Sequence, residues 1–152
     1  MILEVGREGT RKTRICGAYR EHTGGFSGLK TPEAQTERLQ RMLEVWKETT
    51  KHDDYLIIGD INVDWNKITD PDYHNKSYAR MIYDFTLCEN SHQINEDNTR
   101  EVLYNGQLKQ SNIDHIYTYK PELIKDLKTQ TMSTSDHKVL KFKKIYKEET
   151  KN

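Results

Sequence analysis

One short segment of the sequence limits the fold more than any other. The apolar run YLII at 55–58 is closed directly by Gly59 and Asp60. Four successive apolar residues without polar alternation are typical of a strand that is buried on both faces. A strand of this kind needs a layer of structure on each side, so the segment predicts a sandwich core. It also places Asp60 and Asn62 at the end of a buried strand, where α/β folds collect their active sites.

The spacing of apolar residues predicts a helix over about 32–51. Thr31 can cap its first turn, and Pro32 suits the first helical position because no backbone N–H is needed there. Apolar residues then recur at i, i+3, i+4 and i+7, which places them on one face of a helix. These residues are Leu39, Met42, Leu43 and Trp46.

Strand patterns occupy much of the remaining chain. The β-branched and aromatic stretch at 13–19 predicts a strand that runs into a polar, glycine-rich loop at 21–30. Asn105-Gly106 predicts a two-residue hairpin turn between 99–104 and the segment that starts at 107. Further strands are predicted at 113–119, 123–131 and 139–146, and a second amphipathic helix carries Tyr78, Met81, Ile82 and Phe85.

Strands with two helices between them predict an α/β sandwich in which helices cover a mixed sheet. The length suits one domain, which we place at 1–146, with a charged tail at 147–152. Fourteen aromatic residues (nine Tyr, three Phe and two Trp) favour a folded chain, although 32% of residues are charged against 34% hydrophobic. The net charge of zero argues against tight DNA binding by this chain alone.

Other function classes find little support in the sequence. No apolar run approaches the roughly 20 residues of a membrane span, and the N-terminus has no signal-peptide pattern. We therefore expect an intracellular protein, nuclear or cytoplasmic, without a membrane partner. Cys16 and Cys88 show no zinc-ligand spacing and are interpreted as free thiols. Five histidines are expected at the surface: His22, His52, His74, His92 and His115.

Three segments place acidic or imidazole side chains at strand ends. They are GDIN at 59–62, SNIDH at 111–115 and STSDH at 133–137. Hydrolysis of a phosphodiester needs a divalent cation on carboxylates, a base for water, and donors for the phosphoryl charge. The three segments hold groups of each kind, although Gly-Asp after a strand is also a common turn and Asp-His alone is more often an exposed turn.

These segments resemble the motifs of the endonuclease/exonuclease/phosphatase (DNase I-like) superfamily. YLIIGDINVDW resembles its GDxN strand end, SNIDHIYT its xIDxI strand, and STSDHKVL its terminal SDH motif, all in the family's order. ICGAYRE resembles the family's YRP segment, and QINEDNTR before SNIDHI is similar to the endonucleases of non-LTR retrotransposons. The resemblance implies the C-terminal part of a four-layered α/β sandwich and a Mg²⁺-dependent DNA endonuclease, with Mn²⁺ as an alternative ion.

The resemblance also implies a role for each matching residue. Asp136 is expected as a metal ligand, His137 as the imidazole near the scissile phosphate, and Asp114 as the carboxylate that orients His137. Asp60 is expected to position or deprotonate the attacking water. Phosphate oxygens are expected to accept hydrogen bonds from Asn62 and Tyr19, and weaker expectations for nucleic-acid contact fall on Arg20, Arg100, Ser111 and Asn112.

The chain departs from the family pattern at its N-terminal side. The family's Asn-bearing strand and its Glu-bearing QET segment, which supplies a magnesium ligand, have no match, and Glu4 is not promoted to that role. We therefore keep three alternatives: an active endonuclease, a non-catalytic remnant that binds nucleic acid or protein, and a phosphomonoesterase or inositol-phosphate phosphatase. Exposed sheet edges would favour self-association, and a longer parent would carry a reverse transcriptase.

Overall fold

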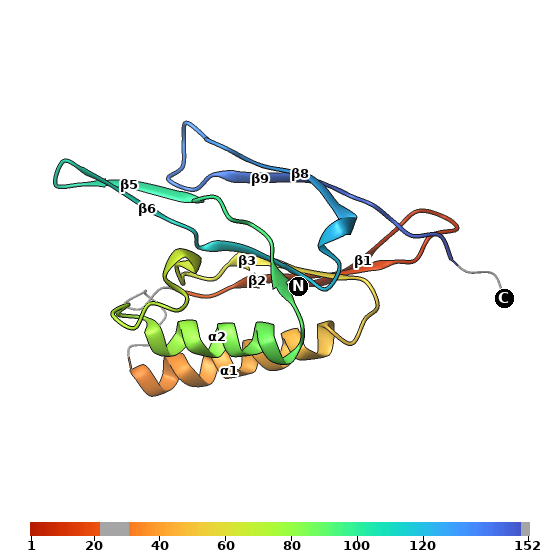
Figure 1. The fold of residues 1–152 in the computed structure, drawn as a ribbon, viewed down its shortest axis with the longest axis horizontal. Helices are drawn as coiled ribbons and strands as arrows, with labels where there is room; N and C mark the ends of the chain where they lie inside the picture. The colour runs from red at the N-terminus through yellow and green to blue at the C-terminus, as the bar shows by residue number, and fades with distance from the viewer. Residues whose placement is uncertain (22–30, 150–152) are drawn as a thin grey trace.

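A mixed five-stranded sheet with the order β1-β2-β3-β7-β4 forms the centre of the molecule (Figure 1). The computed structural model describes residues 1–21 and 31–149; nearly all of the loop expected at 21–30, and residues 150–152 of the expected tail, lie outside the described residues. The strands of the sheet are β1 (Ile2–Val5), β2 (Thr13–Tyr19), β3 (Tyr55–Asp60), β4 (His92–Gln93) and β7 (Asp114–Thr118).

Strand β3 is parallel to β2 and antiparallel to β7. Parallel neighbours require a crossover, and α1 (Pro32–Thr49) provides it. The predicted cap is confirmed, because the Thr31 hydroxyl accepts a hydrogen bond from the Ala34 N–H at 3.1 Å. The helix ends two residues earlier than predicted. The second predicted helix is confirmed as α2 (Lys76–Cys88).

Helices α1 and α2 cover one face of the sheet (Figure 1). The interface is centred on Trp46, whose ring is fully buried and lies 5.4 Å from the Phe85 ring and 5.0 Å from the Tyr117 ring, centroid to centroid. Aromatic pairs at these distances add to the free energy gained by burying apolar surface. The apolar face predicted for α1 therefore packs as expected.

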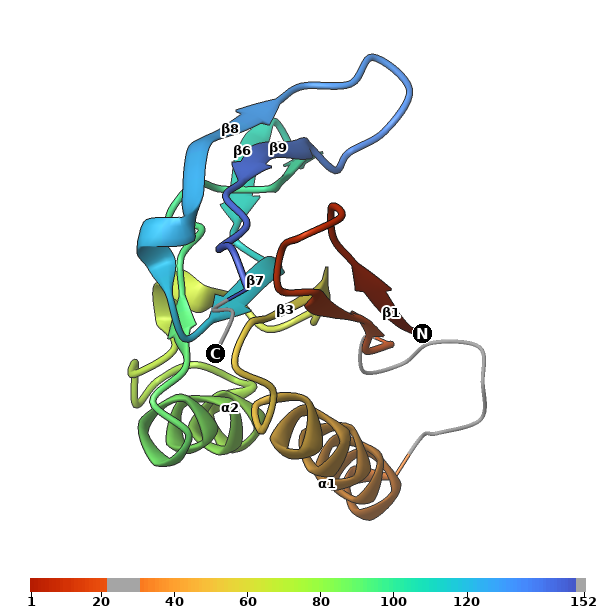
Figure 2. The same cartoon turned by 90° about the vertical axis from the view of Figure 1, so that its right-hand side faces the viewer.

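The opposite face of the sheet is covered by a two-stranded layer of β8 (Ile124–Gln130) and β9 (Val139–Lys144) (Figure 2). A second apolar cluster, built on Leu56, Ile116 and Ile124, fills this interface. Residue 56 faces one layer and residue 57 the other, which is why the run at 55–58 contains no polar residue. The prediction of a doubly covered strand is confirmed.

The hairpin of β5 (Arg100–Tyr104) and β6 (Gln107–Ser111) extends from one end of the sandwich (Figure 1). Its turn residues Asn105 and Gly106 have φ values of 48° and 75°, as a tight hairpin turn requires. Two single-turn 3₁₀ segments, η1 (Trp65–Lys67) and η2 (Pro121–Leu123), complete the described elements. No helix in the described part of the chain is both long and apolar enough to cross a membrane.

The α/β class predicted from the sequence is confirmed, whereas β1 and β4 were not predicted. All four residues of β1 are exposed although Ile2, Leu3 and Val5 are apolar, so this strand buries no face of its own. β4 has two residues, too few for any periodicity. Both are edge strands that are defined by backbone pairing with β2 and β7.

A buried ion pair connects the β8–β9 layer to the central sheet. The Lys144 ammonium lies 2.7 Å from a carboxylate oxygen of Asp54, and their side chains are only 8% and 6% exposed. The hydroxyl of Thr13 donates to the same oxygen at 2.9 Å. Removal of one member of such a pair leaves a buried charge without its partner.

We expect Lys144→Met to lower the free energy of unfolding by roughly 3–5 kcal/mol, because the Asp54 carboxylate stays buried and unpaired. Urea unfolding followed by tryptophan fluorescence measures the change. The matched control is Lys143→Met, since the Lys143–Asp126 pair is 79% and 60% exposed and is worth at most about 1 kcal/mol. Equal effects of the two substitutions would contradict this assignment.

Candidate active site

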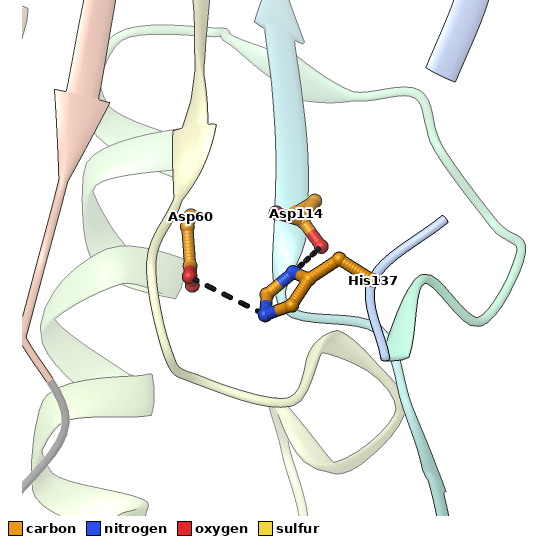
Figure 3. Close-up of side chains that lie close together, drawn as sticks. All are labelled: Asp60, Asp114 and His137. Atoms are coloured by element: carbon orange, nitrogen blue, oxygen red, sulfur yellow. Dashed lines mark hydrogen bonds and ion pairs between the residues drawn. The ribbon is translucent and has the colours of Figure 1, made fainter. Parts of the chain in front are cut away.

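Two carboxylates lie opposite one another where β3 ends and β7 begins. Asp60 and Asp114 are direct partners in the antiparallel register. The imidazole of His137, from the segment before β9, lies between them (Figure 3). Its Nδ1 is 3.1 Å from a carboxylate oxygen of Asp114, and its Nε2 is 3.9 Å from one of Asp60. The structure thus brings together three residues that the sequence distributes over 78 positions.

The backbone of the β5 start holds the His137 segment in place. Arg100 forms an isolated antiparallel bridge with His137. On either side of that bridge, the Lys138 N–H donates to the Thr99 carbonyl at 2.6 Å, and the Glu101 N–H donates to the Asp136 carbonyl at 3.0 Å. His137 is therefore positioned by strand-like pairing, although it belongs to no strand itself.

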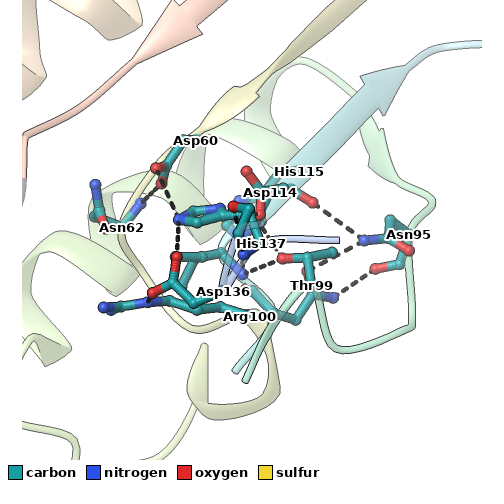
Figure 4. A network of polar contacts seen from close by, with 12 residues as sticks. Asp60, Asn62, Asn95, Thr99, Arg100, Asp114, His115, Asp136 and His137 are labelled. Atoms are coloured by element: carbon teal, nitrogen blue, oxygen red, sulfur yellow. Dashed lines mark hydrogen bonds and ion pairs between the residues drawn. The ribbon is translucent and has the colours of Figure 1, made fainter. Parts of the chain in front are cut away.

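Buried polar side chains fix the other half of the site (Figure 4). The hydroxyl of Thr99 accepts hydrogen bonds from the backbone N–H groups of Ile113 and Asp114 at 3.2 and 3.0 Å. The amide of Asn95 donates to the Asp114 carbonyl at 3.1 Å, and the Asn112 amide donates to the Asn95 carbonyl at 2.7 Å. Asn95 lies in the QINEDNTR segment at 93–100, but the resemblance of that segment assigned it no role, so only the fold reveals this one.

Asp136 lies beside the cluster of Asp60, Asp114 and His137 and is paired with Arg100. The Arg100 Nε is 2.9 Å from one Asp136 oxygen, and the other oxygen is 4.0 Å from the His137 Nε2. Arg100 lowers the pKa of the Asp136 carboxyl, chiefly through this hydrogen bond. A cation from the protein therefore already compensates Asp136, and its role as a metal ligand stays a prediction from the sequence.

Tyr19 and Asn62 lie next to Asp60. Tyr19 is the β2 partner of Asp60 in the parallel register, and it is 61% exposed. Asn62 follows Asp60 by two residues with a φ of 53°, and its backbone N–H donates to the Asp60 side chain at 3.1 Å. Both side chains stand at the strand end where the sequence placed them, and their contact with phosphate stays a prediction.

Arg20 and Asn112 are buried, in contrast to Arg100 and Ser111, which are partly exposed. The exposed fractions of Arg20 and Asn112 are 2% and 0%, and both side chains donate hydrogen bonds to backbone carbonyls of the protein. In these positions their observed partners are protein groups, and contact with nucleic acid stays an untested prediction for all four residues.

The prediction that His115 lies at the surface is wrong. Alternation along β7 points this side chain into the interior, where it is 0% exposed. Its Nδ1 lies 2.7 Å from the Tyr117 hydroxyl and its Nε2 3.0 Å from the Asn112 carbonyl. Burial lowers the pKa of His115 to about 4, so the ring is neutral at physiological pH and serves the packing of the site.

The electrostatics of the cluster centre on Asp60. Burial raises the pKa of the Asp60 carboxyl, and the neighbouring Asp114 raises it further, while His137 acts in the opposite direction. The folded protein therefore binds a proton at Asp60 more tightly than the unfolded chain does. Stability is then lost as pH rises from the ordinary pKa through the raised pKa.

We expect Asp60→Asn to raise the melting temperature at neutral pH in the presence of chelator, because the substitution removes a disfavoured buried charge. The gain should shrink on acidification and disappear below the ordinary carboxyl pKa, where wild-type Asp60 is neutral in both states. Thermal melts across pH measure this. The control Asp136→Asn should show no gain, since Arg100 lowers the pKa of Asp136. Destabilisation by Asp60→Asn at neutral pH would refute the assignment.

The donor set of the cluster fits a divalent cation. Asp60, Asp114 and His137 each offer a ligand atom, and these atoms lie within 4.8 Å of one another. Among the described residues this is the one group of three or more such side chains in that geometry. Two carboxylates suit Mg²⁺, and the imidazole adds a donor that Mn²⁺ accepts more readily than Mg²⁺.

Mn²⁺ titration followed by electron paramagnetic resonance is expected to show one site that Asp114→Asn weakens at least about tenfold, since both a carboxylate and the orientation of His137 are lost. The control Asp97→Asn changes an exposed carboxylate outside the cluster and should leave the affinity unchanged. Equal binding by wild type and Asp114→Asn would place the ion elsewhere.

A groove of about 570 Å³ lies next to the cluster. It is bordered by the segment after β3 on one side and by the β5–β6 hairpin on the other. Asn62 and Arg100 line the end nearest the cluster, while Lys67, Tyr104 and Lys109 line the remainder. The Lys109 ammonium lies 4.6 Å from the centre of the Tyr104 ring. The groove thus combines cations with an aromatic face.

The fold and this site together define a class of α/β sandwich with carboxylates and an imidazole at its strand ends. Two solved structures share the fold. The endonuclease domain of TRAS1, a telomere-specific non-LTR retrotransposon, matches 94% of this chain at 14% identity with a TM-score of 0.61. The 3′ phosphatase NExo from Neisseria, bound to a product DNA hairpin, matches 90% at 17% identity with a TM-score of 0.58.

These similarities confirm the DNase I-like α/β fold expected from the sequence. The chain spans 62% of the length of each of the two structures. At these levels of identity the likeness establishes the fold and leaves the activity open. No protein-family model matches the sequence, and no curated protein matches it.

Proposed function

We propose that this chain is a metal-dependent phosphodiesterase domain that hydrolyses DNA, of retroelement origin. The observation that carries the proposal is the convergence of Asp60, Asp114 and His137 from three distant segments within 4.8 Å of one another. Like charges are placed this close in a fold mainly where a cation or a reaction requires them. The adjoining groove with Lys67, Arg100 and Lys109 supports a polyanionic substrate.

The residues of the chain divide the chemistry between them. A divalent cation bound at the cluster would polarise a phosphoryl oxygen and lower the pKa of water. Asp114 holds the Nδ1 of His137 at 3.1 Å, which directs the Nε2 toward the phosphate. Asp60, whose carboxylate lies 3.9 Å from the His137 Nε2, is assigned to position the attacking water or to accept its proton.

Three further groups are assigned to the phosphate in this proposal. Asn62 and Tyr19 donate hydrogen bonds to its oxygens, and Arg100, which is paired with Asp136, contributes positive charge beside the cluster. The resulting products are a 3′-hydroxyl and a 5′-phosphate. Two solved structures that share this fold are a retrotransposon endonuclease domain and a phosphatase bound to a DNA hairpin, which supports DNA over a small phosphoester.

A second candidate is a nucleic-acid-binding module without catalysis. The observation that favours it is the ion pair between Arg100 and Asp136. Arg100 thereby binds the carboxylate that the sequence motif assigns to the metal. The same groove would then bind DNA, and the cluster would have no catalytic task. Cleavage assays with metal separate the two candidates, because both predict binding and only one predicts product.

We expect the purified protein to nick supercoiled plasmid with Mg²⁺ or Mn²⁺ and not with chelator. His137→Ala and Asp136→Ala should each lower the nicking rate at least roughly 100-fold, because the first removes a positioned imidazole and the second the carboxylate that the sequence motif assigns to the metal. Gel quantification of open-circular DNA measures the rate. Oligonucleotides with a 3′-phosphate, and an inositol phosphate, test the phosphomonoesterase alternative in parallel.

The matched control for nicking is His92→Ala, which removes an exposed imidazole outside the cluster and should leave the rate unchanged. Full activity of folded His137→Ala would contradict the site assignment. Plasmid binding without any nicking by folded wild type would instead favour the non-catalytic module.

A further inference from the structure

Arg20, directly after β2, is a buried charged residue with incomplete hydrogen bonding. It is 2% exposed, and its guanidinium carbon lies 4.5 Å from the centre of the Tyr78 ring. Its Nη1 donates to the carbonyl oxygens of Ile61 and Asn62 at 3.4 and 3.3 Å. The Nε and Nη2 groups are buried without a hydrogen-bond partner. Buried donors without partners lower stability, so stability alone does not account for this residue.

The backbone of Arg20 contacts the same segment as its side chain. The Arg20 N–H donates to the Asp60 carbonyl at 2.8 Å. The Asn62 side-chain amide donates in return to the Arg20 carbonyl at 2.5 Å. Arg20 thus donates hydrogen bonds to the carbonyl oxygens of three successive residues, 60 to 62. These residues form the turn at the end of β3.

The turn at 60–62 has a conformation that needs support. Asn62 has a φ of 53°, in the sparsely populated left-handed region, which asparagine adopts more readily than most residues other than glycine. Such a backbone persists only where surrounding contacts fix it. The contact from Asn62 N–H to the Asp60 carboxylate supports it from within, and Arg20 supports it from outside. A relaxed turn would move the Asn62 side chain and the Asp60 carboxylate relative to His137.

We propose that Arg20 is a positioning residue that holds the 60–62 turn, and with it Asp60 and Asn62, in the geometry of the active site. Arg20 touches no substrate in this role and acts through the two carbonyls. The inference rests on the proposed function for its catalytic consequence. Its structural consequence, a fixed left-handed turn at Asn62, is independent of any activity.

Arg20→Met tests the role, because methionine keeps the length and apolar packing of the side chain and removes its donors. We expect kcat for nicking to fall roughly 10- to 100-fold with KM little changed, as for small displacements of reacting groups. The melting temperature should stay the same or rise, since two unpaired buried donors disappear. Backbone amide exchange of Asn62, measured by NMR on protein with ¹⁵N-labelled asparagine, should accelerate at least tenfold.

Arg14→Met is the matched control, because Arg14 lies near the other end of β2 and its Nε is also buried without a partner. It should leave kcat and Asn62 exchange unchanged. Arg20→Lys, which keeps one cationic donor, should restore part of the rate. Unchanged Asn62 exchange in Arg20→Met would overturn the positioning role, as would a general loss of amide protection with a lower melting temperature.

The two proposals fail in distinguishable ways. Absence of cleavage by folded wild type would overturn the proposed function, whereas Asn62 exchange is measured without substrate or metal and still decides the role of Arg20. Cleavage by wild type with an unchanged kcat in Arg20→Met would overturn the positioning role alone.

Discussion

The pairing of β3 with β2 on one side and β7 on the other is the interaction on which the site depends. β3 is parallel to β2 and antiparallel to β7, so the end of β3 meets the end of β2 and the beginning of β7. Asp60 is therefore flanked by Tyr19 and Asp114. The backbones also approach closely at Gly59, where any side chain would collide with the carbonyl oxygen of Ala18. A larger residue would separate the strands that carry the site.

Charge is the second constraint, because the fold holds two carboxylates in one antiparallel pair. Like charges directly opposite on neighbouring strands are destabilising, and here the imidazole of His137 lies between them. The nearby Asp136 has a separate partner in Arg100. Burial and, to a smaller extent, Asp114 raise the pKa of Asp60, and His137 offsets these effects only in part. Sites that bind cations or perform acid–base chemistry commonly accept this loss of stability.

The support around the site consists mainly of buried amides and hydroxyls. Thr99 and Asn95 bond to backbone groups of Asp114, and the Asn112 amide donates to the Asn95 carbonyl. His115 contacts the Asn112 carbonyl from the interior. Buried networks in which every polar group has a hydrogen-bond partner are rigid, because a side chain that moves leaves a buried donor or acceptor without its partner. Arg20 performs the corresponding task on the β3 side. The two carboxylates are thus held by different neighbours, and the network that holds each can be altered separately.

The sequence by itself determined the elements whose signal lies within a short stretch of residues. Three such predictions are confirmed: the apolar run at 55–58, the face of α1 around Trp46 and the Asn105-Gly106 turn. Each is recognised from residues that are adjacent or within two helical turns of one another. Motif order also selected Asp60, Asp114 and His137 before any geometry was known. These features are local, so a linear pattern is enough to reveal them.

Only the tertiary structure decided which polar residues are buried and which partners they have. His115 and Arg20 carry surface-type side chains, yet strand alternation and the position after β2 place both in the interior. The Arg100–Asp136 pair and the Asn95 contacts join residues whose proximity no spacing predicts. Edge strands β1 and β4 exist through backbone pairing alone. Burial and hydrogen bonding of polar groups depend on which segments meet in space, and that is fixed by the packing of layers.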